Sequence, residues 1–299
     1  MAARMAWTRR HRFAVAAVCF AVIAVYISFI EDRSCSLCAV YPFPDLRLEL
    51  RPLALHCPQP LVSVVLITKD NFEPLQNAID AILHQTYPNV EVVVVDDASE
   101  DPRYLTLESG RDRNRFRVLR STGSGGVLGV VRNMGIREAR GSLVAFTDDD
   151  DVFLPTKLEE QVNTLCRYAN TSVAMSATEA YALDVPRWST NEETGARSFT
   201  AIDPTAPPAG LRLYMKEERG YTAAELPPGL WGWQVFGSGN NPVVGPSVLV
   251  RRDVFIIGGG FNLCPMSLYC EDLVYWHNAL QNGFRIHFDP TPSMLYDIL

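Results

Sequence analysis

Short apolar runs rich in β-branched residues recur along this chain and alternate with segments of helical periodicity. Val62–Ile67, Val90–Val95 and Leu143–Phe146 are such runs, and their length and composition predict buried strands. Pro74–Leu83 and a segment at about 130–140 lie between them and carry apolar residues at helical spacing. Strands that alternate with helices predict an α/β fold, in which helices flank a mixed, mostly parallel central sheet.

Acidic residues stand where the predicted strands end. Asp70 lies in the turn after the first strand, Asp96 and Asp97 follow the second, and Asp148–Asp151 follow the third. In open α/β sheets, ligands bind outside the carboxyl ends of the strands. Several strands therefore deliver carboxylates to one edge of the sheet, and the sequence predicts a ligand site there.

The run Asp148–Asp151 places four carboxylates in succession. Side chains alternate along an extended chain, so Asp148 and Asp150 should point one way and Asp149 the other. Adjacent carboxylates repel one another unless a cation is near, and Mn²⁺ or Mg²⁺ prefers oxygen ligands while leaving room for substrate phosphates. The alternative interpretation is a solvated acidic loop that caps the next helix.

The composition narrows the range of partners. The 299 residues carry a net charge of −7, and no basic stripe with interleaved aromatics is present, so we expect no nucleic-acid partner. The regular pattern breaks down at about 180–245, where Trp231 and Trp233 stand two residues apart. These rings could stack on a sugar, or they could be core aromatics on one face of a strand.

The N-terminal region contains an uncharged apolar segment, Phe13–Ile30, that is long enough to be a membrane span. The basic residues that precede it are Arg4, Arg9, Arg10 and Arg12. Their bias predicts a cytosolic tail at 1–12, an uncleaved signal anchor at 13–30 and a lumenal remainder. A cleaved signal peptide is the alternative. The proline-rich residues 31–60 are typical of a stem.

A lumenal location would permit disulfides among the cysteines that follow the anchor. The sequence does not determine their pairing, although Cys264 and Cys270 are near enough to close a small loop. Asn170-Thr171-Ser172 is a sequon for N-glycosylation, usable only if this placement is right.

A set of motifs occurs in the order typical of one family. They are Val62-Ser63-Val64-Val65-Leu66-Ile67-Thr68, His84-Gln85-Thr86-Tyr87-Pro88-Asn89, Val95-Asp96-Asp97-Ala98-Ser99, Val131-Arg132-Asn133-Met134-Gly135-Ile136, Phe146-Thr147-Asp148-Asp149-Asp150-Asp151, Gly259-Gly260-Phe261 and Glu271-Asp272. Over about residues 61–299 the chain resembles the inverting family 2 glycosyltransferases, which have the GT-A fold.

The resemblance implies roles for individual residues. A nucleotide-sugar half at 61–165 would bind the donor through Thr68, Asp70, Asp96, Asp97, Arg132, Asp148 and Asp149. Asp148 and Asp150 would hold Mn²⁺ or Mg²⁺, and Asp272 would be the general base beside its acidic neighbour Glu271. An acceptor half at 180–299 would hold the acceptor, with Trp231 and Trp233 as binding residues.

The expected function is transfer of a single sugar, with inversion, from a UDP-sugar to a lumenal glycan, protein or lipid. We expect a single-pass type II protein of the Golgi or ER membrane. No Gln-x-x-Arg-Trp segment and no further spans are found, which argues against a polysaccharide synthase. We expect no separate C-terminal acceptor domain, because the chain ends soon after the last predicted strand.

Two other functions compete with this one. A non-catalytic nucleotide-sugar or glycan-binding relative would lack the acidic pair or the base, and both are present. A nucleotidyltransferase typically has a Gly-rich basic loop after its first strand, whereas this chain has Thr68-Lys69-Asp70-Asn71.

Overall fold

The computed structural model describes residues 55, 57, 59–191, 194–219, 221, 228–231, 243–261 and 271–298. The predicted anchor, most of the predicted stem, Trp233 and the Cys264–Cys270 loop lie outside these residues. Within them, no helix is long and apolar enough to cross a membrane.

The parallel half of the sheet contains the strands predicted at Val62–Ile67, Val90–Val95 and Leu143–Phe146, together with one further strand. These are β1 (Val62–Thr68), β2 (Val90–Asp96), β3 (Phe116–Arg120) and β4 (Leu143–Asp148). β1 lies between β2 and β4, and Val65 is paired with Val93 on one side and Phe146 on the other. All three side chains are buried, as expected for a sheet that is covered on both faces.

The other half of the sheet is mixed. Its strands are β5 (Val152–Phe153), β6 (Val173–Leu183), β9 (Arg212–Leu213), β10 (Gly229–Trp231), β11 (Val248–Arg251) and β12 (Arg285–Asp297). β11 runs antiparallel to both β4 and β6, while β12 runs parallel to β6. Among the described residues the main strand order is β10-β12-β6-β11-β4-β1-β2-β3, which confirms the predicted mixed sheet.

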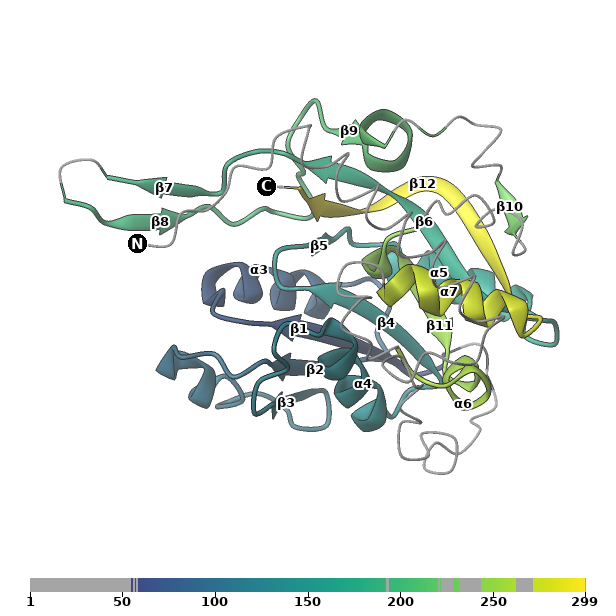
Figure 1. Ribbon diagram of the computed structural model, residues 1–299. Helices are drawn as coiled ribbons and strands as arrows, with labels where there is room; N and C mark the ends of the chain where they lie inside the picture. Colours follow the sequence, from purple (N-terminus) through teal and green to yellow (C-terminus); the bar gives the residue numbers. More distant parts are fainter. Residues whose placement is uncertain are drawn as a thin grey trace, which may run out of the picture.

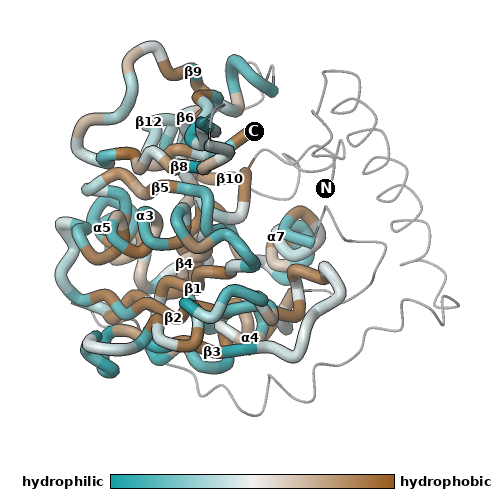
Figure 2. Tube along the Cα trace, turned by 90° about the vertical axis from the view of Figure 1, so that its left-hand side faces the viewer, coloured by the Kyte–Doolittle hydropathy of each residue, from teal (hydrophilic) through white to brown (hydrophobic). Residues whose placement is uncertain are grey.

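Helices cover both faces of this sheet (Figures 1 and 2). On one face lie α3 (Phe72–Leu83) and α5 (Lys157–Arg167), which pack on Val64, Val92 and Ala145. On the other lie α4 (Leu128–Glu138), α6 (Asp253–Gly258) and α7 (Glu271–Gln281), which pack on Val65, Val95 and Phe146. The strand side chains alternate between these two cores, as the period of a strand requires.

A hairpin projects from the body of the domain (Figure 1). It consists of β7 (Trp188–Thr190) and β8 (Arg197–Phe199), which form a separate two-stranded sheet. We call residues 187–202 the arm. It lies in the region where the sequence pattern breaks down.

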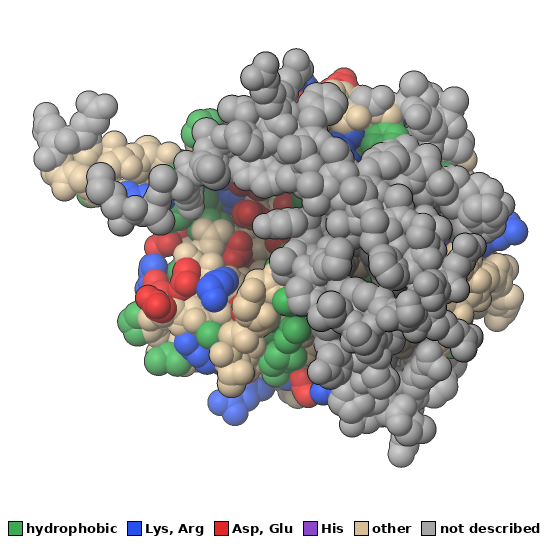
Figure 3. Space-filling view, in the orientation of Figure 1, with side chains coloured by type: hydrophobic (Ala, Val, Ile, Leu, Met, Phe, Trp, Pro, Cys, Tyr) green, Lys and Arg blue, Asp and Glu red, His purple; other side chains and the backbone are tan. Residues whose placement is uncertain are grey.

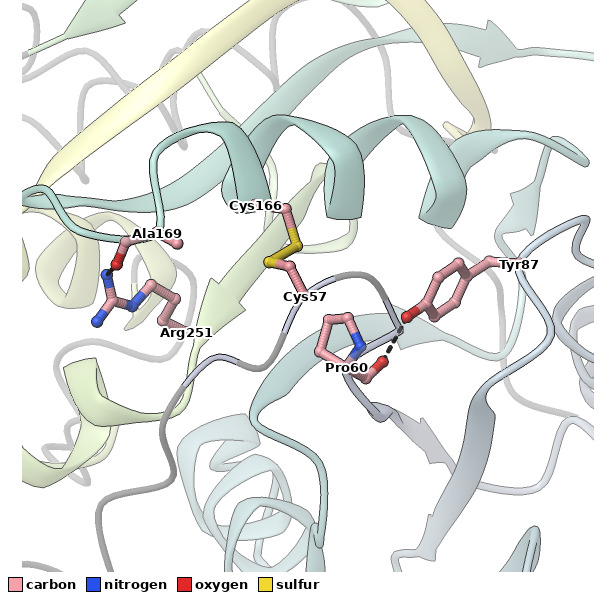
Figure 4. Close-up of a disulfide and its surroundings, with 6 residues drawn as sticks. All are labelled: Cys57, Pro60, Tyr87, Cys166, Ala169 and Arg251. Carbon is pink, nitrogen blue, oxygen red and sulfur yellow. Dashed lines mark hydrogen bonds between the residues drawn. A yellow bond between two sulfur atoms is a disulfide. The ribbon is translucent and has the colours of Figure 1, made fainter.

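The end of the predicted stem is attached to the domain (Figure 4). Cys57 forms a disulfide with Cys166 at the end of α5. Nearby, the Tyr87 hydroxyl donates a hydrogen bond of 2.5 Å to the carbonyl of Pro60. The chain therefore enters β1 from a segment that is held at the amino ends of the parallel strands.

Candidate active site

The carboxyl ends of β1, β2 and β4 meet the first turn of α7 at one edge of the sheet. Figure 3 shows acidic side chains gathered in a hollow of the surface below the arm. Asp148 ends β4 at this edge and Asp149–Asp151 follow it, while Glu271 and Asp272 open α7. The sequence prediction of a site at the strand ends therefore agrees with the fold.

Asp149 holds the turn after β1 in place. Its carboxylate accepts hydrogen bonds from the Thr68 hydroxyl at 2.6 Å and the Asn71 amide at 2.7 Å. Burial raises the pKa of Asp149 to about 6, although these bonds oppose the rise. The carboxylate thus points toward β1, and its donor-binding role stays a prediction.

Tyr104 is a residue of this site that sequence reasoning missed. It is buried in a short 3₁₀ turn, and its hydroxyl lies 3.0 Å from the Thr68 hydroxyl and 2.9 Å from the Asn71 backbone nitrogen, which donates to it. Only the fold brings it to β1, because it lies far along the chain and belongs to no motif.

Two non-glycine residues at this edge have left-handed backbone conformations, Asp70 with φ 51° and Ala98 with φ 58°. The loops that contain them interlock, because the Asp70 amide donates to the Ser99 hydroxyl and its carboxylate accepts from the Glu100 amide. Such conformations cost on the order of 1–3 kcal/mol each and cluster at functional sites. The strain therefore supports a binding role for this edge.

Asp96 and Asp97 are both buried and both engaged. Asp96 accepts from the Ser99 amide at 2.9 Å and from Arg120 at 2.7 Å. Asp97 accepts from the Ser121 hydroxyl at 2.6 Å and from the amide and hydroxyl of Ser124 at 2.7 and 2.6 Å. In this structure the two carboxylates organise the loops around the cleft, and their predicted contact with the donor stays a prediction.

Arg132 joins the two acidic groups of the site. It lies on α4, which approaches β1 so closely that a Cβ on Gly135 would lie 2.2 Å from a Val65 methyl. Its guanidinium is buried and donates to Asp148 at 3.1 Å and also to Glu271. Burial opposes the charge, yet Asp148 and Glu271 raise the pKa of Arg132, so it remains a cation.

Glu271 and Asp272 differ in their surroundings. Burial raises the pKa of Glu271 to about 7, and its carboxylate is engaged by Arg132. Asp272 is only half-buried, and one of its oxygens accepts from the Leu273 amide at 2.7 Å. The structure places the pair beside Asp148 through Arg132, and of the two Asp272 is the more open to a ligand.

The residues at the end of β4 fit a hard divalent cation. Burial and neighbouring carboxylates raise the pKa values of Asp150 and Asp151, and a bound cation would favour their charged forms. In the described part of the chain, no three His, Cys, Asp or Glu side chains converge as a ready-made metal cage. Mg²⁺ is often bound by one or two carboxylates together with substrate phosphates, and Asp148 with Asp150 suits that mode.

The structure contradicts the prediction that Trp231 binds the acceptor. Its side chain is 1% exposed and stacks on Phe288 of β12, with ring centroids 4.3 Å apart. The residue faces the core because β10 pairs with β12 and directs this ring onto the sheet. Trp233 lies outside the described residues.

Comparison with known families agrees with this geometry. The model of the family "Glycosyl transferase family 2" matches residues 63–222, which is more than half of the chain. The chain belongs to glycosyl transferase family 2, and the prediction of this enzyme family is confirmed.

Curated relatives match less than half of this chain. A Rickettsia felis protein described as an uncharacterized glycosyltransferase is 35% identical over 123 residues, which are 40% of this chain and 19% of that protein. WfgD of Escherichia coli, a UDP-Glc:alpha-D-GlcNAc-diphosphoundecaprenol beta-1,3-glucosyltransferase, is 32% identical over 108 residues, 36% of this chain and 42% of its own. This chain thus spans less than half of either relative.

Solved structures share the fold over most of the chain. TarS 1–349 of S. aureus superposes with a TM-score of 0.56 at 19% identity, covering 79% of this chain and 60% of that one. The mannosyltransferase PcManGT of Pyrobaculum calidifontis gives 0.51 at 16% identity, covering 94% and 68%. These likenesses confirm a GT-A-like fold.

Proposed function

We propose that this protein transfers one sugar from a nucleotide sugar, a UDP-sugar in our assignment, to an acceptor hydroxyl with inversion. The observation that carries the proposal is the buried Arg132, which connects Asp148 after β4 to Glu271 at the start of α7. One cation thereby holds the donor side and the acceptor side of the cleft in a fixed relation.

The chemistry required of such a site matches its residues. The departing nucleoside diphosphate gains negative charge, and Mn²⁺ or Mg²⁺ held by Asp148 and Asp150 would stabilise that charge as a Lewis acid. Arg132 supplies a permanent positive charge beside Asp148. Asp272 would accept the proton of the acceptor hydroxyl as general base.

The relatives support the choice of donor. TarS 1–349 has been crystallised with UDP and with UDP-GlcNAc, and PcManGT with GDP-Man and Mn²⁺. The name of WfgD includes UDP-Glc as donor. We extend a nucleotide-sugar donor to this chain, and a lumenal glycan, protein or lipid remains our proposed acceptor class.

We further propose that the domain lies in the lumen of the Golgi or ER, attached by residues 13–30. The Cys57–Cys166 disulfide supports this proposal, because such bonds persist mainly in oxidising compartments. Asn170 of the sequon is exposed in the turn after α5, where an oligosaccharide could be attached.

The experiment that tests the function incubates the purified protein with UDP- and GDP-sugars, Mn²⁺ and a panel of lumenal acceptors. We expect release of a nucleoside diphosphate that depends on metal and is lost in Asp150→Asn. Release of inorganic diphosphate would indicate a nucleotidyltransferase instead. Binding of nucleotide sugars without any release, across the panel, would indicate a non-catalytic relative.

A further inference from the structure

One buried arginine attaches the base of the arm to Asp148–Asp151, which we call the acidic loop. Arg187 precedes β7, and its guanidinium donates to the backbone carbonyl of Asp150 at 2.7 Å. A second nitrogen donates to the Asn77 side chain on α3, also at 2.7 Å. Its carboxylate neighbour is Asp297 at the end of β12, 3.6 Å away. Three elements and the acidic loop therefore meet at this one side chain.

The same arginine is also supported by residues of β8 and of the chain that follows it. The Phe199 ring of β8 lies under its guanidinium, with 4.6 Å between Cζ and the ring centroid. Asn77 also accepts from the Ile202 amide and donates to the Ile202 carbonyl, at 2.8 and 2.9 Å. The arm is thus seated on α3 by paired hydrogen bonds, and this seating determines where Arg187 lies.

The aromatic contacts continue outward along the arm. Trp188 lies against Phe199, with centroids 5.2 Å apart, and Arg197 lies over the Trp188 ring at 4.4 Å. Arg197 is exposed, and within the described part of the chain no hydrogen bond or ion pair joins it to Asp148–Asp151. The arm therefore offers two arginines stacked on aromatic rings, of which only Arg187 reaches Asp150.

Resting on the proposed function, we propose that Arg187 is a positioning residue of the metal site. By holding Asp150, Arg187 couples the position of the acidic loop to the position of the arm. The backbone carbonyl of Asp150 accepts a hydrogen bond from a residue of the arm, which lies outside the predicted nucleotide-sugar half at 61–165. This bond is partly buried, and a hydrogen bond from a charged donor is stronger than one between neutral groups. Arg187 is also a buried cation beside Asp150, Asp151 and Asp297, where it offsets their repulsion.

The test uses the full-length protein in detergent and measures Mn²⁺ binding in the presence of UDP, from the electron paramagnetic resonance signal of free Mn²⁺. A hydrogen bond to a charged group contributes about 1.5–3 kcal/mol, which is lost when the group is removed. Arg187→Met should therefore raise the half-saturating Mn²⁺ concentration by on the order of tenfold to a hundredfold. Arg187→Lys should give a smaller increase, because one ammonium cannot replace the planar fork.

Arg197→Met is the matched control, since it removes the same charge from the same arm without touching Asp150. We expect its Mn²⁺ binding to equal that of the unaltered protein. UDP affinity in the absence of metal should be unchanged in every variant, which separates metal positioning from general loss of structure.

The outcomes distinguish this inference from the proposed function. If the unaltered protein binds Mn²⁺ with UDP and Arg187→Met binds it equally well, the positioning role is overturned while the function stands. If Arg187→Met does not fold, Arg187→Lys and Phe199→Leu decide, and unchanged Mn²⁺ binding in both overturns the inference. A failure of the unaltered protein to bind Mn²⁺ with UDP overturns the metal role and this inference together.

Discussion

Glu271 and Asp272 are adjacent in the sequence, yet the fold gives them different tasks. Glu271 is buried against Arg132, whereas Asp272 is half-buried and more accessible to a ligand. A carboxylate that neutralises a buried guanidinium serves the structure first, and removal of one partner of such a pair is strongly destabilising. We therefore assign the chemical role to Asp272 and the supporting role to Glu271.

This division predicts opposite signatures for two isosteric variants. Asp272→Asn should lower turnover by about 10²–10⁴-fold, the usual effect of losing a general base, while nucleotide binding and unfolding stay nearly unchanged. Glu271→Gln should lower the free energy of unfolding by up to about 3–5 kcal/mol, because Arg132 loses a charged partner. Single-turnover assays and denaturant titrations measure both. A stable Glu271→Gln protein that loses more turnover than Asp272→Asn would reverse the assignment.

For individual residues, the sequence indicated which acidic residues belong to the site but not which residues they contact. Asp148–Asp151 and the Glu271-Asp272 pair could be found because acids at strand and helix ends are visible in a linear pattern. Tyr104, Arg187 and Asn77 could not, because their importance depends on hydrogen bonds across 33 to 125 residues of chain. The acceptor-binding role was predicted wrongly for Trp231, because alternation alone does not say which face of a strand a ligand can reach.

Among the elements, those with one clear period were predicted within a few residues. The predicted strand Val90–Val95 corresponds to β2 and the predicted helix Pro74–Leu83 to α3. β6 was missed, and β12 extends over 13 residues, from Arg285 to Asp297. β12 contains Pro290 and Pro292, which usually interrupt strands, and its pairing with β6 shifts register on either side of Pro292. Bulges let the strand continue where sequence rules predict its end.

The start of α5 contains a buried charge that the sequence did not single out. The Lys157 side chain is 0% exposed, and its amine donates to Gln161 at 2.6 Å and to the Ser247 carbonyl at 3.3 Å. No salt bridge of Lys157 is found among the described residues. Burial lowers the pKa of Lys157 from 10.5 to about 7.

This burial makes the stability contribution of Lys157 depend on pH. Between pH 7 and 10.5 the unfolded chain carries the proton and the folded chain does not, so stability rises with pH across this window. Lys157→Met removes that dependence. We expect its free energy of unfolding, relative to the unaltered protein, to be more favourable at pH 7 than at pH 10, measured by denaturant titration. A difference that is constant with pH would contradict a buried, titrating Lys157.

For the whole molecule, the attachment of the stem decides how the domain is connected to the rest of the chain. The Cys57–Cys166 disulfide closes a loop with a sequence separation of 109, for which chain entropy gives about 4–5 kcal/mol. It lies with Tyr87 and Pro60 at the amino ends of the parallel strands, whereas the acidic cleft lies at their carboxyl ends. The chain therefore enters the domain at the edge of the sheet opposite the cleft.

The proposed topology makes a prediction for the intact protein that is independent of catalysis. Under the proposed topology, the arginine bias around Phe13–Ile30 would place everything beyond the anchor in the lumen, and Asn170 is exposed in a turn. In microsomes, the protein should carry one endoglycosidase-sensitive oligosaccharide that is absent from Asn170→Gln. The lumenal domain should be resistant to added protease until detergent opens the vesicles.

The disulfide provides a second test of whether the domain lies in an oxidising compartment. Cys57 and Cys166 should resist alkylation in the microsomal protein until a reductant is added, because an oxidising lumen keeps them paired. Asn170→Gln is the matched control here, since it removes the oligosaccharide and leaves the disulfide in place. Complete digestion in sealed microsomes, together with an unglycosylated Asn170, would contradict the topology. The proposed sugar transfer and the connection through Arg132 would still stand, because neither depends on the side of the membrane.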